Sequence, residues 1–170
     1  MRRSWLIVQA NLVPNCCPKG ERLQSAFTQE YPGDDQLVYD NSGYHLECNE
    51  VLAAFRGKHW REVPFETLRY ESAALSFMTP AAYRYYLPAY LLACILDYAE
   101  ADMIPDTVVF SLIPPTDPKS VKIYGESYRR CMAGFTPAQR DTLRSFLEFM
   151  KARHGEDYPS GDLDQALASL

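Results

Sequence analysis

The sequence lacks the residue patterns on which the commonest enzyme chemistries are built. It holds only three histidines, and its eight glycines are scattered singly along the chain. No Gly-x-Ser-x-Gly motif is present, which excludes the serine nucleophile elbow of hydrolases. A glycine-rich phosphate loop is excluded as well, because such a loop needs several glycines within a few residues. We therefore expect no cofactor and favour a protein without catalytic activity.

Cysteine is present without a regular pattern. The five cysteines form an odd set with no repeated spacing, whereas a small secreted module pairs regularly spaced cysteines in disulfides. This pattern favours a reducing compartment, so we expect the protein to be cytoplasmic.

No hydrophobic run is long enough for a membrane span. The uncharged run over residues 85–96 has 12 residues, whereas a spanning helix needs about 20. From Thr79 to Leu96 the only charged residue is Arg84, so a helix built from this segment has no polar face and must be surrounded by protein. We expect Pro88 to kink this buried helix or to divide it in two.

The first 20 residues differ from the rest of the chain. Arg2 and Arg3 precede a short apolar patch, as in a secretory leader, but Gln9 and Asn11 break the patch and no cleavage motif follows. We predict an N-terminal extension over residues 1–20, as a terminal strand or a poorly ordered segment. A single helical domain is expected over residues 21–170.

Spacing and capping signals predict the elements around the buried helix. Thr79-Pro80 and Thr136-Pro137 each combine an N-cap threonine with proline at the first helical position, and Gln139 completes a capping box in the second. The run after Asp106 suits either a buried strand or a helix that Asp106 caps, and its helical neighbours favour the helix. Pro18 and Glu21 open a further expected helix, which reaches Tyr31. Other helices are expected from Cys48 to Phe55, from Pro64 onwards, and from Leu163 to Leu170.

These signals predict a mainly α fold. It is a single-domain irregular helical bundle around the buried apolar helix, with one or two short strands at most. The predicted core consists of Phe55, Trp60, Leu75, Tyr86, Leu91, Phe110, Phe146 and Met150.

The charge of the chain is negative and uneven. The net charge is −5, yet the first 20 residues carry three bases and no acid, which leaves 14 bases against 22 acids, or −8, in the remainder. A surface of that sign repels phosphate backbones and attracts basic proteins. We expect no nucleic-acid partner and a basic protein partner, although the charge can also serve only to keep the protein in solution.

Four acids stand within ten residues, directly after the buried helix. They are Asp97, Glu100, Asp102 and Asp106, and no base lies among them. This cluster is a candidate docking patch for a basic partner or a site for a hard cation. The alternative is a solvated helix end without further role. One of these acids is also a candidate ion-pair partner for Arg84.

His45 and Cys48 form the one pairing that suggests a metal. One helical turn places them on the same side, and Cys16 and Cys17 could complete a four-ligand zinc site. Adjacent cysteines are awkward ligands, so a core cysteine beside a capped turn is the favoured interpretation.

The stretch from Phe27 to Met150 resembles a family of small bacterial proteins of unassigned function. The resemblance covers about three quarters of the chain and implies a mostly helical fold with no catalytic residues to carry over. It rests on Tyr31-Pro-Gly-Asp-Asp-Gln-Leu-Val38, Phe55-Arg-Gly-Lys-His-Trp60, Leu75-Ser-Phe-Met-Thr-Pro-Ala-Ala-Tyr-Arg-Tyr-Tyr-Leu-Pro-Ala-Tyr-Leu-Leu-Ala93, Glu100-Ala-Asp-Met-Ile-Pro-Asp-Thr-Val-Val-Phe-Ser-Leu112 and Phe135-Thr-Pro-Ala-Gln139.

Two classes of function remain open from the sequence. The favoured hypothesis is a non-catalytic acidic binding protein, such as an immunity protein or inhibitor that neutralises a basic toxin or enzyme. The alternatives are a zinc-dependent hydrolase that uses His45 and Cys48, and a housekeeping protein of unknown activity.

Overall fold

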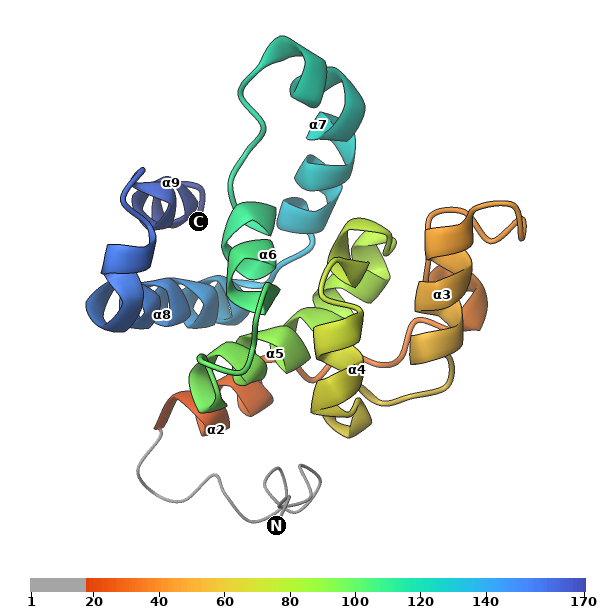
Figure 1. The fold of residues 1–170 in the computed structure, drawn as a ribbon, viewed down its shortest axis with the longest axis horizontal. Coiled ribbons are helices and arrows are strands. Elements are labelled where there is room, and N and C mark those ends of the chain that lie inside the picture. The colour runs from red at the N-terminus through yellow and green to blue at the C-terminus, as the bar shows by residue number, and fades with distance from the viewer. Residues whose placement is uncertain (1–17) are drawn as a thin grey trace.

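The computed structural model describes residues 18–170, and these are mainly α-helical (Figure 1). The predicted fold class is therefore confirmed. The predictions for residues 1–17 lie outside the described residues, and the predicted domain boundary stays a prediction. The α-helices are α2 (Pro18–Ala26), α3 (Leu46–Phe55), α4 (Phe65–Tyr70), α5 (Pro80–Leu96), α6 (Ile104–Ser111), α7 (Pro118–Ala133), α8 (Pro137–His154) and α9 (Asp162–Ala168).

Short 3-10 helices and one β-bridge connect these elements. The bridge pairs Val38 with Met78 in antiparallel fashion, and no strand longer than this occurs in the described part of the chain. The 3-10 helices are η1 (Asp34–Gln36), η2 (Trp60–Glu62), η3 (Ala74–Ser76) and η4 (Gly155–Asp157).

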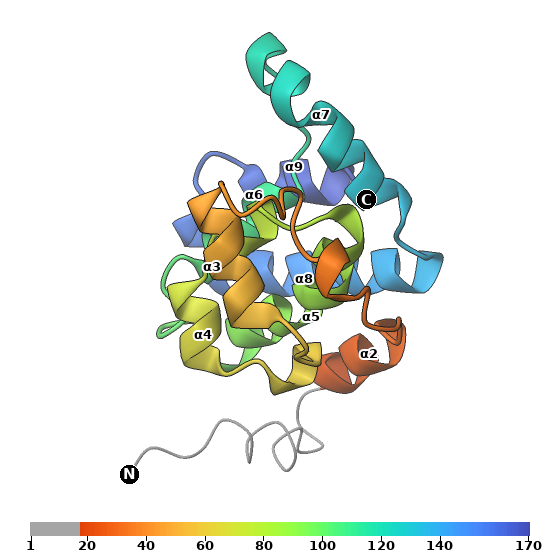
Figure 2. The same cartoon turned by 90° about the vertical axis from the view of Figure 1, so that its right-hand side faces the viewer.

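Helix α5 is the centre of the fold, as the sequence predicts. Twelve of its residues are buried, and it contacts α2, α4, α6 and α7 (Figures 1 and 2). Seven of the eight predicted core residues are buried. Phe110 is the exception, since 53% of its surface is exposed. Its hydrophobicity alone suggested a core position, but it lies on the outward face of α6.

Pro88 does not divide α5, so that part of the prediction is wrong. The helix is continuous over its whole length, although Pro88 has no N–H to donate to the carbonyl of Arg84, four residues earlier. The side-chain amide of Gln29 donates to this carbonyl instead, at 2.6 Å. Gln139 donates in turn to the Gln29 side-chain oxygen at 3.0 Å. Gln29 therefore supplies the hydrogen bond that the proline cannot make, and Gln139 holds Gln29 in place.

Helix α2 is shorter than predicted. It ends at Ala26, five residues before Tyr31. Residues 27–33 are non-helical, and Pro32 disfavours the helical conformation at Tyr31 directly before it. Gln29 lies in this non-helical segment, where its side chain reaches α5.

The two predicted threonine caps are present. Thr79 accepts a hydrogen bond from the backbone N–H of Ala82, and Thr136 accepts one from the N–H of Gln139. The Gln139 side chain accepts from the N–H of Thr136 in return, so the predicted capping box is confirmed.

A third helix begins with the same two-residue design. Asp117 accepts from the N–H of Ser120, and Pro118 follows at the first helical position. This start opens α7, a helix that was not predicted from the sequence.

The helix after Met103 is also confirmed, but Asp106 is not its cap. Helix α6 begins at Ile104, so Asp106 lies inside its first turn.

Helix α7 projects from the body of the protein, as both views show (Figures 1 and 2). Only Gly125 and Met132 among its residues are buried. Arg84 holds its C-terminal end, where the guanidinium donates to the carbonyl of Arg130 at 3.1 Å. The ion pair expected between Arg84 and a nearby acid is therefore wrong. Arg84 meets the partial negative charge of a helix C-terminus instead.

Candidate functional site

The four predicted acids lie together around the connection from α5 to α6, here called the acidic corner. Asp97, Glu100 and Asp102 are exposed, and Asp106 is half-buried. The residues between them at positions 101 and 104 are fully buried and apolar. Asp102 has a φ of 52°, which is the left-handed region that aspartate tolerates better than most residues. The buried anchors and this tight turn hold the carboxylates on a well-defined surface.

No carboxylate of the acidic corner forms an ion pair with any residue in the range 18–170. The surrounding sequence offers no base either, since residues 85–118 contain five acids and no lysine, arginine or histidine. Negative charge is therefore concentrated in this segment, and no base within it offsets that charge.

A fifth acid reaches the corner from η4, directly after α8. The hydroxyl of Tyr98 donates to Asp157 Oδ2 at 2.8 Å, and the ring of His154 stacks on Tyr98 with centroids 3.5 Å apart. Burial and the Asp157 carboxylate raise the pKa of Tyr98 to about 12. Asp157 lies far from the other acids in the chain, and no sequence signal links it to them.

The outward face of α6 leads from the acidic corner to a pocket. Met103 and Phe110 are seven residues apart, which is two helical turns, so they share one face, and both are more than half exposed. Ser111, next to Phe110, already lines the pocket. The acidic corner and the pocket therefore lie at the two ends of one short helix.

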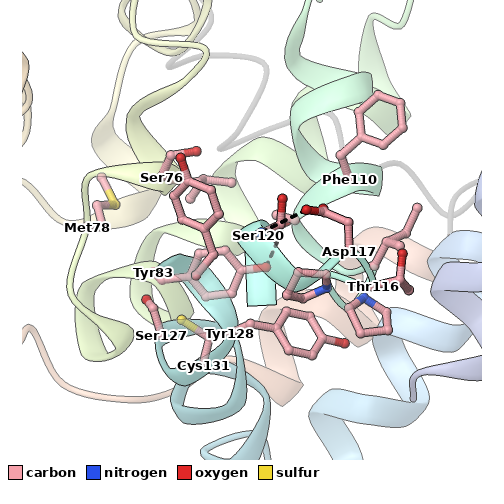
Figure 3. A pocket seen from close by; sticks show the side chains of 16 residues that line it. Ser76, Met78, Tyr83, Phe110, Thr116, Asp117, Ser120, Ser127, Tyr128 and Cys131 are labelled. Atoms are coloured by element: carbon pink, nitrogen blue, oxygen red, sulfur yellow. Dashed lines mark hydrogen bonds between the residues drawn. The ribbon is translucent and has the colours of Figure 1, made fainter. Parts of the chain in front are cut away.

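The pocket, here called the α7 pocket, has a volume of about 530 Å³ and lies between η3, the start of α5, the end of α6 and the inner face of α7 (Figure 3). Aromatic rings, prolines and hydroxyl groups form most of its wall. The lining residues are Leu75, Ser76, Met78, Tyr83, Phe110, Ser111, Ile113, Pro114, Pro115, Thr116, Asp117, Ser120, Tyr124, Ser127, Tyr128 and Cys131.

Two tyrosine hydroxyls of this wall are already hydrogen-bonded within the protein. The Tyr83 and Ser111 hydroxyls lie 2.8 Å apart. Tyr128 donates to the carbonyl of Leu112 at 3.2 Å. Burial raises the pKa of Tyr83 far above its ordinary value and that of the Cys131 thiol to about 11. The side chains of Tyr83 and Cys131 are therefore uncharged at neutral pH.

His45 and Cys48 occupy structural positions in α3. His45 is the N-cap, and its Nδ1 accepts the N–H of Cys48 at 3.4 Å. Its Nε2 lies 2.7 Å from the Tyr39 hydroxyl, and the Cys48 side chain is fully buried. Both ring nitrogens of His45 are thus engaged, and Cys16 and Cys17 lie outside the described residues.

Two further findings concern metals and membranes. In the described range, no three histidine, cysteine, aspartate or glutamate side chains converge as metal ligands would. None of the helices found there is both long and apolar enough to cross a bilayer.

The fold and the surface define a small, mainly helical protein with an acidic corner and a separate aromatic pocket. The chain belongs to a family of unknown function, DUF6714, whose model matches residues 35–169. The resemblance to a family of unassigned function is confirmed to this extent, while its signature motif and bacterial origin stay predictions. No curated protein and no solved structure matches the chain.

Proposed function

We propose that this protein is a non-catalytic binding protein whose acidic corner docks a basic protein partner, in the manner of an immunity protein or an enzyme inhibitor. The observation that carries the proposal is the set of four neighbouring carboxylates without an ion-pair partner among residues 18–170. A basic partner would supply the missing positive charge.

Local stability does not explain all four of these acids. Asp102 directly precedes the N-cap of α6, and Asp106 lies in its first turn. Negative charge at both positions stabilises the helix N-terminus. Asp97 is the C-cap of α5, where the helix dipole favours positive charge. This acid therefore stands where it weakens the fold slightly, which is typical of residues kept for binding.

The corner also offers an apolar contact. Met103 is 54% exposed between Asp102 and the buried Ile104. Interfaces combine such a central apolar contact with a charged rim that speeds encounter. Binding would then depend on charge for its rate and on Met103 for part of its lifetime.

The test takes as partner a basic protein encoded by a neighbouring gene, where one is found, and measures association by surface plasmon resonance at low salt. Replacing Asp97, Glu100 and Asp102 with lysine should slow association by at least about tenfold. The matched control makes the same charge change at three exposed acids elsewhere, by replacing Glu66, Asp141 and Glu148 with lysine.

The two variants separate the effect of the site from that of net charge. A slow corner variant beside a nearly normal control supports the proposal. Equal rates for the corner variant and the wild type, or equal slowing by both variants, would contradict it. Circular dichroism spectra that match the wild type confirm that both variants are folded.

A further inference from the structure

We infer that the α7 pocket binds a small organic cation, an ammonium group carried on a compact apolar body. This site is distinct from the acidic corner, and the inference does not rest on the proposed function. It depends on the size of the pocket, its aromatic wall and the charges that line it.

The pocket has the dimensions and composition of a small-molecule site. Its volume of about 530 Å³ lies within the usual range for such sites. Tyr83, Phe110, Tyr124 and Tyr128 bring four rings to the wall. Phe110 and Tyr124 are 53% and 61% exposed, so a bound ligand would cover apolar surface that water now contacts.

Two of the four rings have hydroxyls that are already bonded within the protein. Those of Tyr83 and Tyr128 are bonded to Ser111 and Leu112, which leaves the rings themselves as the apolar part of the wall. The face of an aromatic ring is negative and attracts a cation. A wall of several rings is therefore suited to an ammonium group.

The charged groups point to the same ligand class. Asp117 is the one charged residue among those that line the pocket. Its hydrogen bonds to Ser120 hold the pKa of the Asp117 carboxyl below its ordinary value. The carboxylate is therefore ionised at neutral pH, and an anionic ligand would meet repulsion with no base in the wall to offset it.

The basic residues of α7 are turned away from the pocket or already paired. Residues 120, 124, 127, 128 and 131 line the pocket and share one face of the helix, whereas Lys119, Lys122 and Arg129 lie outside that face by the helical period. Arg129 and Arg130 both form ion pairs with Glu126. Arg84 donates to the carbonyl of Arg130 and does not line the pocket, and its positive charge acts on Cys131 at the edge of the wall. The rings therefore remain available to a cationic ligand.

Unused hydroxyls can orient the ammonium group. Neither Ser76 nor Thr116 makes a side-chain hydrogen bond to another residue in the range 18–170, and both line the pocket. Each offers lone pairs that can accept from an N–H group. The carboxylate, the rings and these hydroxyls together distinguish a cation from a neutral molecule of the same shape.

Three probes of matched shape test the inference by isothermal titration calorimetry. They are phenethylamine, phenethyl alcohol and phenylacetate, which differ mainly in charge. Phenethylamine should bind about tenfold more tightly than the alcohol, and phenylacetate should bind most weakly. Equal binding of all three, or tightest binding of phenylacetate, would overturn the inference.

Variants locate the site. Phe110→Ala and Tyr124→Ala should each weaken phenethylamine binding severalfold, and their exposure means that the fold should survive. Asp117→Asn keeps a side chain able to cap α7 and should reduce the preference for the amine over the alcohol. The control is Tyr70→Ala, which removes a tyrosine that is 83% exposed on α4 and should not change binding. An equal loss in the control, or no loss in the two pocket variants, would refute the assignment.

Discussion

Replacing Gln29 with alanine isolates the consequence of carrying Pro88 inside α5. The side chain of Gln29 donates to the Arg84 carbonyl, which Pro88 cannot serve, and accepts from Gln139. Gln139 itself closes the capping box of α8 through the N–H of Thr136. One side chain therefore links the centre of α5 to the start of α8.

The loss of unfolding free energy follows from the polar groups that lose a hydrogen-bond partner. An unsatisfied buried polar group costs about 1–3 kcal/mol, and both bonds are only partly buried, so we expect Gln29→Ala to destabilise by about 2–4 kcal/mol. Pro88→Ala restores an N–H that can reach the Arg84 carbonyl. In that background Gln29→Ala should cost only about 1–2 kcal/mol, which predicts a coupling of about 1–2 kcal/mol.

Urea unfolding followed by circular dichroism measures the four free energies of this double-mutant cycle. The matched control is Gln165→Ala, which removes an exposed glutamine from α9 and should change stability by less than about 0.5 kcal/mol. If the effects of Gln29→Ala and Pro88→Ala simply added, Gln29 would not be replacing the hydrogen bond that Pro88 lacks.

Two further predictions concern pH and the end of α7. Burial raises the pKa of Tyr83, Tyr90 and Cys94 above their ordinary values of 10.0, 10.0 and 9.0, so the unfolded chain loses these protons first and stability should fall by about 1.4 kcal/mol per pH unit per group above those values. The part of the tyrosinate absorbance that comes from the buried tyrosines should then appear in the same alkaline step as the loss of circular dichroism, apart from the signal of the exposed tyrosines. Ionisation of the buried tyrosines before unfolding would contradict this. An alanine Cβ at Gly134 would clash with the Arg84 guanidinium, so Gly134→Ala should destabilise by about 1 kcal/mol in the wild type, yet stabilise by about 0.5 kcal/mol when Arg84 is also alanine. Thermal unfolding of the wild type and of Arg84→Ala, each with and without Gly134→Ala, measures the two changes in stability. A change of the same sign in both backgrounds would refute the clash.

The parts of the fold that can be predicted from sequence are those that local patterns determine. An apolar segment without a polar face must be buried, and α5 is buried. Threonine followed by proline begins a helix at Thr79 and Thr136 because both residues act within one turn. Phe110 marks the limit of such patterns, since hydrophobicity does not tell which face of a short helix turns outward.

Helix α7 was not predicted, although its start follows the same rule. Asp117 and Pro118 repeat the cap and first helical position of the other two starts, with aspartate in place of threonine. Tyr124, Tyr128 and Cys131 then recur at helical spacing along the pocket wall. The signal for this helix is therefore present in the sequence. The pocket itself has no such signal, because its walls come from segments that are distant in the chain.

The contact between Gln29 and α5 belongs to a class that no local pattern predicts. Proline inside a helix indicates a missing hydrogen bond, and a break in the helix is the expectation that follows from sequence. The fold instead brings an amide from 55 residues away, and this becomes visible only when the packing of α2 against α5 is known.

The acidic corner differs, because its four carboxylates are close in sequence and their clustering can be predicted. What the structure adds there is the contrast between the two acids that stabilise the start of α6, Asp102 and Asp106, and Asp97, which opposes the dipole of α5. A carboxylate that stabilises a helix start needs no partner to explain it, whereas one placed against a helix C-terminus does. That contrast gives the binding hypothesis a physical basis that charge counting alone does not provide.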